Sequence, residues 1–534
     1  DRDASSAHAD ASWQPWSHPL DDSLAPYYRW FVDGQTNACF NLIDRHVLSG
    51  RGDQIAIIFE GDRWDPSKND GRGGPVHEQR VTYRELLVEV ALRTRVLKQA
   101  DLSCGDRVAL NLPNVLEQIF YILACQRLGV IYTPVFGGFS AKTLSDRIHD
   151  AGAKVVITAD GGYRNAEVVP YKSTYTDPAL DNYIPRPAAL EALSATLRTR
   201  LSADVAERLE AQVSEAIAGE ITLERADVMR ELGLALERER GTAPEVIAEL
   251  RTTVASELAN VGHAVTHVIV IRYTGNDIVE HTRDFWSPDL VAQVETDLLA
   301  DAGVADRAAL YSLDDTALWQ AVGPHAAAVP VEANWPLFII YTSGSTGKPK
   351  GVVHTHGGWL SGITHTLRTV FNANQDDCLY VIGDPGWITG QSYLIAAPLA
   401  FGMSTMIAEG SPLFPHAGRF ASIIERNNVT IFKAGSTFLK AVMTDPASTQ
   451  EMSRYDMSSL KVGTFCAEPV SPTVQQFAMD NICSHYINSY WATEHGGIVF
   501  SCPWGDFKPL QADAKTWPLP WIQAQVRVAE ATTD

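Results

Sequence analysis

Long apolar runs are missing from this sequence, and cysteines are few. No stretch approaches the ~18 apolar residues that a helix needs to cross a bilayer, and residues 1–6 (DRDASS) show no apolar signal segment. The seven cysteines are scattered without metal-ligand spacing, which is typical of reduced thiols in the cytoplasm. These shortages predict a cytoplasmic protein with no membrane partner.

A surplus of basic residues is missing as well. Lys and Arg total 43 against 64 Asp and Glu, which gives a formal net charge of -21. A field of this sign disfavours nucleic acid as a partner. A local group of N–H donors and lysines can still bind an anion, so an anionic small molecule remains open. The 534 residues are too many for one hydrophobic core, so we expect two or more domains.

The most informative segment is rich in glycine and hydroxyl groups and follows an apolar run. Residues 341–351 read YTSGSTGKPKG and follow PLFII at 336–340. Glycines let backbone N–H groups turn towards an anion, while hydroxyls and lysines add donors suited to phosphate. The residues that follow, GVVHTH, are β-branched and alternating, so we predict a strand–loop–strand flap over phosphates. Pro349 follows Lys348, which excludes the P-loop of the NTPases, where Ser or Thr follows the lysine.

A pattern of alternating strands and helices begins near Val81. It follows a segment of about 75 residues that we interpret as irregular and as wrapping around the body. Thr82 is placed to cap a helix that runs to Ala100. A second helix is predicted over 115–128, and buried strands over 108–112, 130–135 and 155–158. Strands that alternate with helices predict a mostly parallel sheet covered on both faces.

Residues 183–262 interrupt this rhythm with leucine stripes at helical spacing. We predict an inserted bundle of three or four helices whose leucines form its own core. One helix is expected to start at a capping box, Thr242–Glu245, with Pro244 in the first turn.

Further blocks accompany the glycine-rich segment in a fixed order. They are WFVDG (30–34), NLIDRH (41–46), VFGGFS (135–140), GDPGWITG (383–390), EGSP (409–412), AEP (467–469) and YWATE (490–494). Together these blocks resemble those of the adenylate-forming superfamily, and within it the AMP-forming acyl-CoA synthetases of the acetyl- and propionyl-CoA synthetase type. The resemblance implies an α/β fold: a large N-terminal body of two αβα subdomains with parallel-rich sheets, here with an inserted helical bundle.

The resemblance also predicts domain boundaries and implies that the C-terminal part of the family's fold is incomplete here. We expect a wrapping segment and first α/β subdomain at 1–182, the bundle at 183–262, an α/β region with ATP and acyl sites at 263–512, and the start of a truncated β-barrel subdomain at 513–534. The C-terminal lid of the family, with its adenylating lysine, has no counterpart in this sequence. We therefore expect an incomplete enzyme, or the ligase section of a fused, multifunctional propionyl-CoA synthase.

The resemblance also implies which residues form the site. Catalytic roles fall to Thr342, Lys350, Thr493 and Glu494, with Glu494 as the Mg²⁺ ligand. ATP would be bound by Thr342, Ser343, Gly344, Ser345, Thr346, Gly347, Lys348, Ala467, Glu468, Pro469, Asn488, Tyr490, Trp491 and Thr493. Tyr490 offers a flat face for adenine, and Asn488 an amide for its amine. His354 and His356 are expected to be strand residues rather than metal ligands.

The acyl pocket is expected to be small. Trp491 matches the tryptophan with which acetate and propionate enzymes close their pocket. Cys466 stands where acetate-selective relatives carry valine, and Ala434 and Gly435 are predicted to complete the lining. Because cysteine is slightly smaller than valine, the pocket should accept propionate or 3-hydroxypropionate. Trp387 is expected to buttress the site.

Coenzyme A binding departs from the family pattern. Arg164 matches one of two cations that hold the nucleotide phosphate of CoA, but Glu167 stands in place of the second. Either another cation compensates, or CoA arrives differently.

We therefore predict a short-chain carboxylate–CoA ligase that uses MgATP and coenzyme A. Its partners would be a small carboxylate, ATP and CoA, with further domains of a fused enzyme or a second copy left open. Two alternatives stand beside it. One is a nucleotide-binding module that depends on a missing lid, and the other is an adenylating domain that serves a carrier protein.

Overall fold

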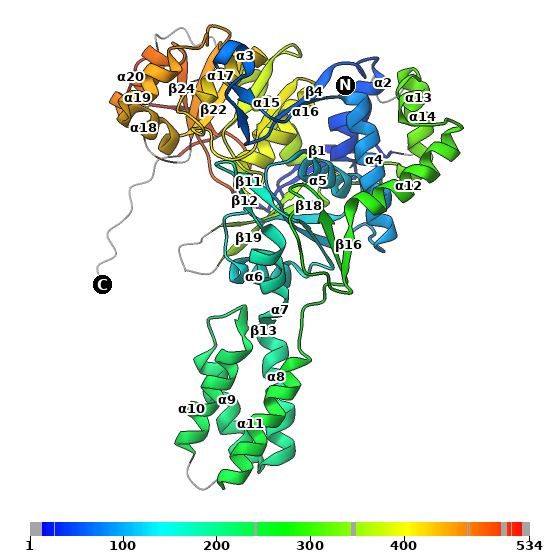
Figure 1. Ribbon diagram of the computed structural model, residues 1–534, viewed down its shortest axis with the longest axis vertical. Coiled ribbons are helices and arrows are strands. Elements are labelled where there is room, and N and C mark those ends of the chain that lie inside the picture. Colours follow the sequence, from blue (N-terminus) through cyan, green and yellow to red (C-terminus); the bar gives the residue numbers. More distant parts are fainter. Residues whose placement is uncertain are drawn as a thin grey trace.

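The computed structural model describes residues 13–25, 27–239, 243–342, 349–466, 468, 470–502, 510–513 and 515–525, with only the backbone of Pro324 and His325. Two large sheets organise this part of the chain into a body, from which a helical bundle projects (Figure 1). No helix in these ranges is both long and apolar enough to cross a membrane.

The first large sheet has seven strands in the described residues. In spatial order they are β16 (Asp284–Trp286), β15 (His267–Ile271), β10 (Val155–Ala159), β8 (Arg107–Asn111), β9 (Ile131–Pro134), β18 (Pro336–Thr342) and β19 (Lys350–Thr355). All neighbours run parallel except β18 and β19, which form an antiparallel hairpin with Thr342 opposite Lys350. This hairpin confirms the predicted strand–loop–strand. Its loop, Ser343–Lys348, lies outside the described residues.

The second large sheet has nine strands in the described residues. In spatial order they are β26 (Trp517–Pro518), β25 (Phe500–Ser501), β24 (Tyr486–Tyr490), β23 (Val462–Cys466), β22 (Ile431–Gly435), β20 (Cys378–Val381), β21 (Ser404–Ala408), β4 (Ile55–Glu60) and β7 (Glu78–Thr82). The six strands from β24 to β4 are parallel, and antiparallel strands flank them. The mixed α/β fold with parallel-rich sheets is as predicted.

Helices lie between the two sheets and on both outer faces. The central layer includes η1 (Phe40–Asp44), α2 (Arg45–Leu48), α4 (Tyr83–Gln99), α5 (Leu116–Leu128), α12 (Ser287–Ala302), α13 (Arg307–Tyr311), α14 (Asp315–Ala326), α15 (Gly358–Phe371), η3 (Gly390–Ala396) and α16 (Ala397–Phe401). Outside the first sheet lie η2 (Lys172–Thr176), α6 (Ala141–Ala151) and α7 (Asp177–Asp181). Outside the second lie α17 (Arg419–Asn427), α18 (Ser436–Thr444), α19 (Pro446–Met452) and α20 (Pro472–Asn481).

Each sheet therefore sends alternate side chains to different cores, because successive side chains of a strand point to opposite faces. On β22, Ile431 belongs to the central core, whereas Phe432 and Ala434 belong to the outer core. This parity decides which side chains of β22 reach the central layer.

The predicted helix after Thr82 is present as α4. The Thr82 hydroxyl accepts a hydrogen bond from the Glu85 N–H and the Glu85 carboxylate accepts one from the Thr82 N–H, which completes a capping box. Two expectations need correction. The first 75 residues are not all irregular, since β4 is a buried strand of the second sheet. The segment 1–182 also contributes strands to both large sheets rather than to one subdomain. Its strands β4 and β7 belong to the second sheet, and β8, β9 and β10 belong to the first.

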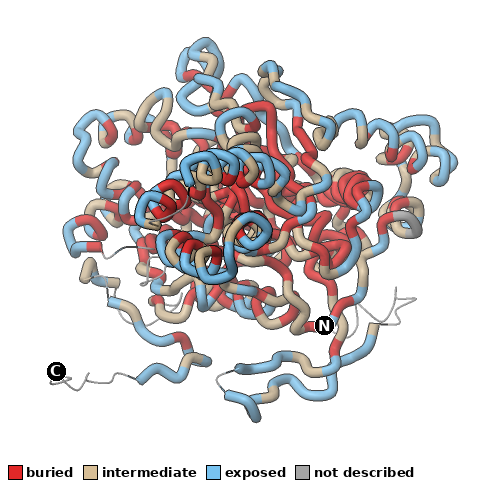
Figure 2. Tube along the Cα trace, turned by 90° about the horizontal axis from the view of Figure 1, so that it is seen from below, coloured by how far each residue is buried: buried red, intermediate tan, exposed pale blue. Residues whose placement is uncertain are grey.

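The inserted segment is a bundle with a core of its own. Its helices are α8 (Arg186–Arg200), α9 (Ala203–Ala216), α10 (Arg225–Arg238) and α11 (Pro244–Ala259). Leu193, Leu197, Leu209 and Val213 are fully buried among each other's helices, which confirms the predicted leucine core. Viewed from below, exposed residues cover the outside of these helices (Figure 2). The helix α11 begins at Pro244; Thr242, the predicted cap, lies outside the described residues.

Shorter strands form small pairs around the body. They are β1 (His18–Asp21) with β2 (Arg29–Val32), β3 (Gln35–Thr36) with β17 (Val331–Glu332), β5 (Trp64–Asp65) with β6 (Gly74–Pro75), β11 (Gly162–Arg164) with β12 (Glu167–Val169), and β13 (Tyr183–Pro185) with β14 (Thr222–Glu224). A short helix, α3 (Lys68–Gly71), lies between β5 and β6.

Candidate functional site

The residues predicted for the site gather where strands of the two sheets end. The strands β18, β22, β23 and β24 end at Thr342, Gly435, Cys466 and Tyr490. In open α/β sheets, ligands bind outside the carboxyl ends of the parallel strands. The topology therefore places these segments at the kind of edge where a ligand site is expected.

The loop after β24 is fastened to the hairpin of the first sheet. His354 on β19 donates from Nε2 to the carbonyl oxygen of Thr493 at 2.9 Å. Burial lowers the pKa of His354 to about 4, while the Thr493 contact and the Glu494 charge act in the opposite direction. The imidazole is therefore neutral at pH 7. This bond joins the glycine-rich hairpin to the Thr493–Glu494 loop.

Gly496 fixes the same loop on its central-layer side. Its carbonyl oxygen accepts hydrogen bonds from Ser392 Oγ (2.6 Å) and Trp359 Nε1 (3.2 Å). Its φ is +70°, and a Cβ there would lie 2.7 Å from His354 Cε1. Only glycine fits without displacing the histidine, so the loop geometry depends on this residue.

Most of the predicted ATP residues that are described are accessible. Tyr490 is exposed and its ring meets Phe500 edge to face, which leaves a face open for stacking. Lys350 and Glu468 are exposed, and Thr342, Asn488 and Thr493 are half-buried. Ala467 and Pro469, like Ser343, Gly344, Ser345, Thr346, Gly347 and Lys348, lie outside the described residues.

Glu494 has the surroundings of a ligand for a substrate-borne cation. Its carboxylate is exposed and forms no ion pair with any described residue. A carboxylate oxygen without a competing cation suits Mg²⁺ bound to phosphates. Another group, Asp177, Asp181 and His281, has ligand atoms within 4.8 Å of one another. Lys172 and Arg283 already pair with these carboxylates, so their charge is balanced by the protein.

The acyl lining predicted from the sequence needs one correction. Gly435 and Cys466 are register partners on neighbouring strands, and a Cβ on Gly435 would meet no atom within 4 Å. Ala434, by contrast, is buried in the outer core with Phe432 and Phe465, on the opposite face of the sheet. Alternation along β22 instead turns Lys433 to the same face as Gly435. The sequence interpretation missed Lys433, although a lysine within the apolar strand IFKAG was a signal.

Trp491 lies over this face. Its ring meets the ring of Tyr393 edge to face, with centroids 5.2 Å apart. Lys433 Nζ lies 5.1 Å from the Tyr393 ring centre and 5.4 Å from that of Trp491. The predicted pocket-closing tryptophan and an unpredicted lysine therefore share one aromatic cluster.

A cavity of about 370 Å³ surrounds the predicted CoA residue Arg164. Its walls include Phe136, Tyr163, Tyr171, Arg164, Asp384, Trp387 and Glu409. Trp387 was expected to buttress the site, but it is 46% exposed and forms part of this wall beside Phe136 and Phe139.

The hairpin that carries Arg164 is held by buried acids. Glu409 accepts a hydrogen bond from the Tyr163 N–H at 2.7 Å, and Asp62 accepts one from the Ala166 N–H at 2.6 Å. Glu167 is the register partner of Arg164 across the hairpin. A second cation approaches from the segment after β4, because the Arg63 guanidinium lies 4.6 Å from the Tyr163 ring centre. The sequence could not identify Arg63, which is about a hundred residues away along the chain.

Asp384 is an acid of this cavity whose pKa is strongly perturbed. Burial raises its pKa to about 7, although the Gly386 N–H donates to its carboxylate at 2.6 Å. Near neutral pH, this acid is therefore a mixture of its charged and neutral forms.

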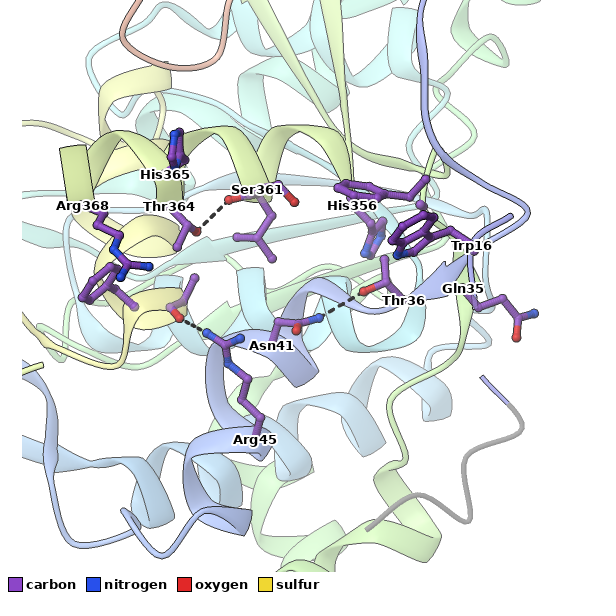
Figure 3. Close-up of a pocket in the computed structure, with 17 residues that line it drawn as sticks. Trp16, Gln35, Thr36, Asn41, Arg45, His356, Ser361, Thr364, His365 and Arg368 are labelled. Carbon is purple, nitrogen blue, oxygen red and sulfur yellow. Dashed lines mark hydrogen bonds between the residues drawn. The ribbon is translucent and has the colours of Figure 1, made fainter. Parts of the chain in front are cut away.

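A larger cavity, about 440 Å³, lies elsewhere and contains none of the predicted site residues (Figure 3). Arg45, Arg368 and His365 line it together with His356. His356 is fully buried and its Nδ1 accepts a hydrogen bond from the Ala38 N–H at 3.0 Å. Its Nε2 has no hydrogen-bond partner among the described residues. His354 is a strand residue as predicted, whereas His356 lies one residue beyond β19.

Two parallel-rich sheets that flank a helix layer, with a glycine-rich hairpin tied to a Thr–Glu loop, define the N-terminal body of an adenylate-forming enzyme. Sequence comparison agrees. The profile of AMP-binding enzymes matches residues 45–533, and that of the acetyl-coenzyme A synthetase N-terminus matches residues 6–42. The chain belongs to the AMP-binding enzyme family.

Curated relatives of the chain include acetyl-coenzyme A synthetases. That of Cupriavidus metallidurans is 31% identical over 96% of this chain and 61% of its own length. That of Herminiimonas arsenicoxydans is 32% identical over 96% and 61%, and that of Ralstonia nicotianae is 33% identical over 97% and 62%. The chain thus spans about three fifths of the length of the relatives it matches.

Proposed function

We propose that this chain is the adenylate-forming section of an AMP-forming ligase that joins a short-chain carboxylate to coenzyme A. The observation that carries the proposal is the bond from His354 to Thr493, because it brings the glycine-rich hairpin and the Thr493–Glu494 loop together. A triphosphate needs donors on more than one side, and this junction offers them from two sheets.

Each predicted residue has a role in this proposal, and the positions of Thr342, Lys350, Asn488, Tyr490, Thr493 and Glu494 near the strand ends support theirs. Thr342, Lys350 and the loop 343–348 would hold the β- and γ-phosphates, and Thr493 the α-phosphate. Glu494 would hold the Mg²⁺ that accompanies ATP, which neutralises charge on the phosphates. Asn488, Tyr490 and residues 467–469 would bind adenine. Since the reaction at phosphorus needs little covalent help, positioning and charge neutralisation are the work of these residues.

The acid would lie between the nucleotide and the Trp491–Cys466 face. Trp491 is held against Tyr393, so its ring is a fixed wall rather than an adaptable one. The open space at Gly435 adjoins Cys466, which supports a pocket for two or three carbons. Among acetate, propionate and 3-hydroxypropionate, we favour a three-carbon acid.

Coenzyme A would approach through the cavity at Arg164. We propose Arg63 as the cation that replaces the one lost at Glu167, because it lies on the ring of the residue beside Arg164. Arginine suits phosphate oxygens through its fork of donors. The seven free cysteines agree with a cytoplasmic setting for such an enzyme.

The test is exchange of radioactive pyrophosphate into ATP in the presence of each acid. We expect exchange with at least one of acetate, propionate and 3-hydroxypropionate, and a loss of about tenfold or more in Glu494→Gln. The matched control is Glu257→Gln, an exposed glutamate on the bundle helix α11, which should leave exchange unchanged.

The same assay separates the alternatives. ATP binding by calorimetry with no exchange for any acid, and no rescue of exchange when a C-terminal lid segment is supplied, would contradict the ligase and favour a nucleotide-binding module. Rescue by that segment would indicate an incomplete ligase. Exchange followed by transfer to a phosphopantetheinyl carrier protein, but not to coenzyme A, would favour an adenylating domain instead.

A further inference from the structure

Lys433 is a buried cation that no acid pairs with in the described part of the chain. Its side chain is fully buried on β22, in the middle of the second sheet. Nζ has no oxygen or nitrogen acceptor within the described part of the chain, its polar neighbour is the Cys466 thiol, and no described carboxylate lies within ion-pair distance. Native proteins leave few buried polar groups unsatisfied, so an unpaired lysine at this depth requires an explanation.

The surroundings of Nζ are those of the predicted acyl pocket. The rings of Tyr393 and Trp491 lie 5.1 and 5.4 Å from Nζ. On the same face of the sheet, Gly435 is two residues along β22 and faces open space. Cys466, the register partner of Gly435, completes this face.

Packing alone does not account for a lysine here. The central-face neighbour Ile431 shows that this strand accepts an aliphatic residue at the equivalent depth. A methionine would fill a similar volume without an amine to desolvate. Burial lowers the pKa of Lys433, while charge interaction and hydrogen bonding with the Cys466 thiol act in the opposite direction. The described part of the chain therefore supplies no oxygen or nitrogen acceptor for this amine.

We infer that Lys433 Nζ is the specificity-determining group of the acyl pocket and hydrogen-bonds a hydroxyl on the distal carbon of a short-chain hydroxy acid. This inference rests on the proposed function and narrows its substrate. Thr493 and Glu494 define the phosphate side of the site, so the carboxylate that is activated faces them. The other end of the acid then faces Trp491, Cys466 and Lys433.

A hydroxyl suits this position better than the other groups a small acid can carry. The methyl end of acetate or propionate offers no acceptor, which would leave Nζ unsatisfied in the complex. A second carboxylate would bring a full charge among two aromatic rings, with a single amine to meet it. A hydroxyl both donates and accepts, so it pairs with the amine in either protonation state.

The experiment compares four acids in pyrophosphate–ATP exchange: acetate, propionate, 3-hydroxypropionate and malonate. We expect kcat/KM for 3-hydroxypropionate to exceed that for propionate by about tenfold or more, because a site built around a hydrogen bond rejects the analogue that lacks it. In Lys433→Met this preference should disappear or reverse. Lys433→Gln, which keeps an N–H donor, should retain part of it. Lys154→Met, at a half-exposed ion pair with Asp106 before β10, is the matched control and should retain the wild-type preference.

Two results would overturn the inference while the ligase proposal stands. One is an unchanged preference for 3-hydroxypropionate in Lys433→Met, and the other is a wild-type preference for malonate or propionate. Absence of exchange with every acid, even when a C-terminal lid segment is supplied, would instead contradict the proposed function. Calorimetric binding of the acids in the presence of ATP then decides the inference alone: loss of 3-hydroxypropionate binding in Lys433→Met supports it, and equal binding overturns it.

Discussion

Two buried cations of this molecule differ in whether an acid pairs with them. Arg127, at the end of α5 in the helix layer, is 1% exposed and donates to both oxygens of Asp44 at 2.6 and 2.9 Å. Trp319 Nε1 also donates to Asp44 at 2.9 Å, so the acid is well satisfied. Lys433, on the central face of the second sheet, has neither an acid nor an oxygen or nitrogen acceptor among the described residues, and its polar neighbour is the Cys466 thiol.

The difference separates a structural charge from a functional one. A paired, desolvated charge stabilises its surroundings only while both partners remain, whereas an unpaired one costs stability in the free protein. Asp384 resembles Lys433 in this respect: it too is a half-satisfied charge near a strand end, held by one backbone N–H. Unpaired buried charges destabilise the free protein, and they cluster at functional sites, where a bound ligand can pair with them.

The largest effect is expected for Arg127→Met. The substitution leaves Asp44 buried without its bidentate partner, which typically costs about 3–5 kcal/mol. Chemical denaturation should show this loss in the free energy of unfolding. A loss below about 1 kcal/mol would show that the pair is not the structural element that the comparison takes it to be.

Asp384 should make stability fall as pH rises. Its pKa is about 7 in the folded state and about 4 when unfolded. Between these values the folded protein binds the extra proton, so stability declines from pH ~4 to ~7 by up to about 1.4 kcal/mol per unit. Asp384→Asn keeps the acceptor for Gly386 and should flatten this slope. Unfolding midpoints measured across pH 4–8 for both proteins provide the check; parallel curves would contradict it.

Lys433→Met should change stability in the opposite direction to Arg127→Met. Removal of an unsatisfied buried amine is expected to stabilise the free protein by about 1–3 kcal/mol. The same denaturation experiment, run beside Arg127→Met, gives the comparison directly. Two losses of similar size would mean that Lys433 is as structural as Arg127.

A smaller effect is expected for His354→Phe. Phe338 and Trp359 already pack around the imidazole, so an aromatic ring fits, but the bond to Thr493 is lost. We expect about 1 kcal/mol less stability and a rise of about threefold to tenfold in KM for ATP as the loop loses its fixed position. An unchanged KM with reduced stability would place His354 with the structural groups.

Much of the framework could be predicted from the sequence, because local rules and tertiary structure agree there. The Thr82–Glu85 capping box is read from four consecutive residues, and α4 begins where it predicts. The hairpin of β18 and β19 follows from an apolar run, a glycine-rich turn and a β-branched run. The leucines of the bundle lie at helical spacing and are buried together.

The arrangement of side chains across the sheets could not be predicted in the same way. A parallel strand buried on both faces is apolar throughout, so its sequence does not show which residue faces which core. That ambiguity led to Ala434 as a pocket residue in place of Lys433. Arg63 was missed for another reason: its approach to Tyr163 depends on the packing of β4 against a distant hairpin.

The most direct test of the account is to locate bound nucleotide. The protein is irradiated with an azido-ATP that carries its reactive group on adenine, and the labelled peptides are mapped by mass spectrometry. The account predicts label on the peptides that contain Glu468 or Tyr490, with protection by excess ATP. Label confined to the residues around the larger cavity, such as His365 and Arg368, would contradict the assignment of the site to the strand ends.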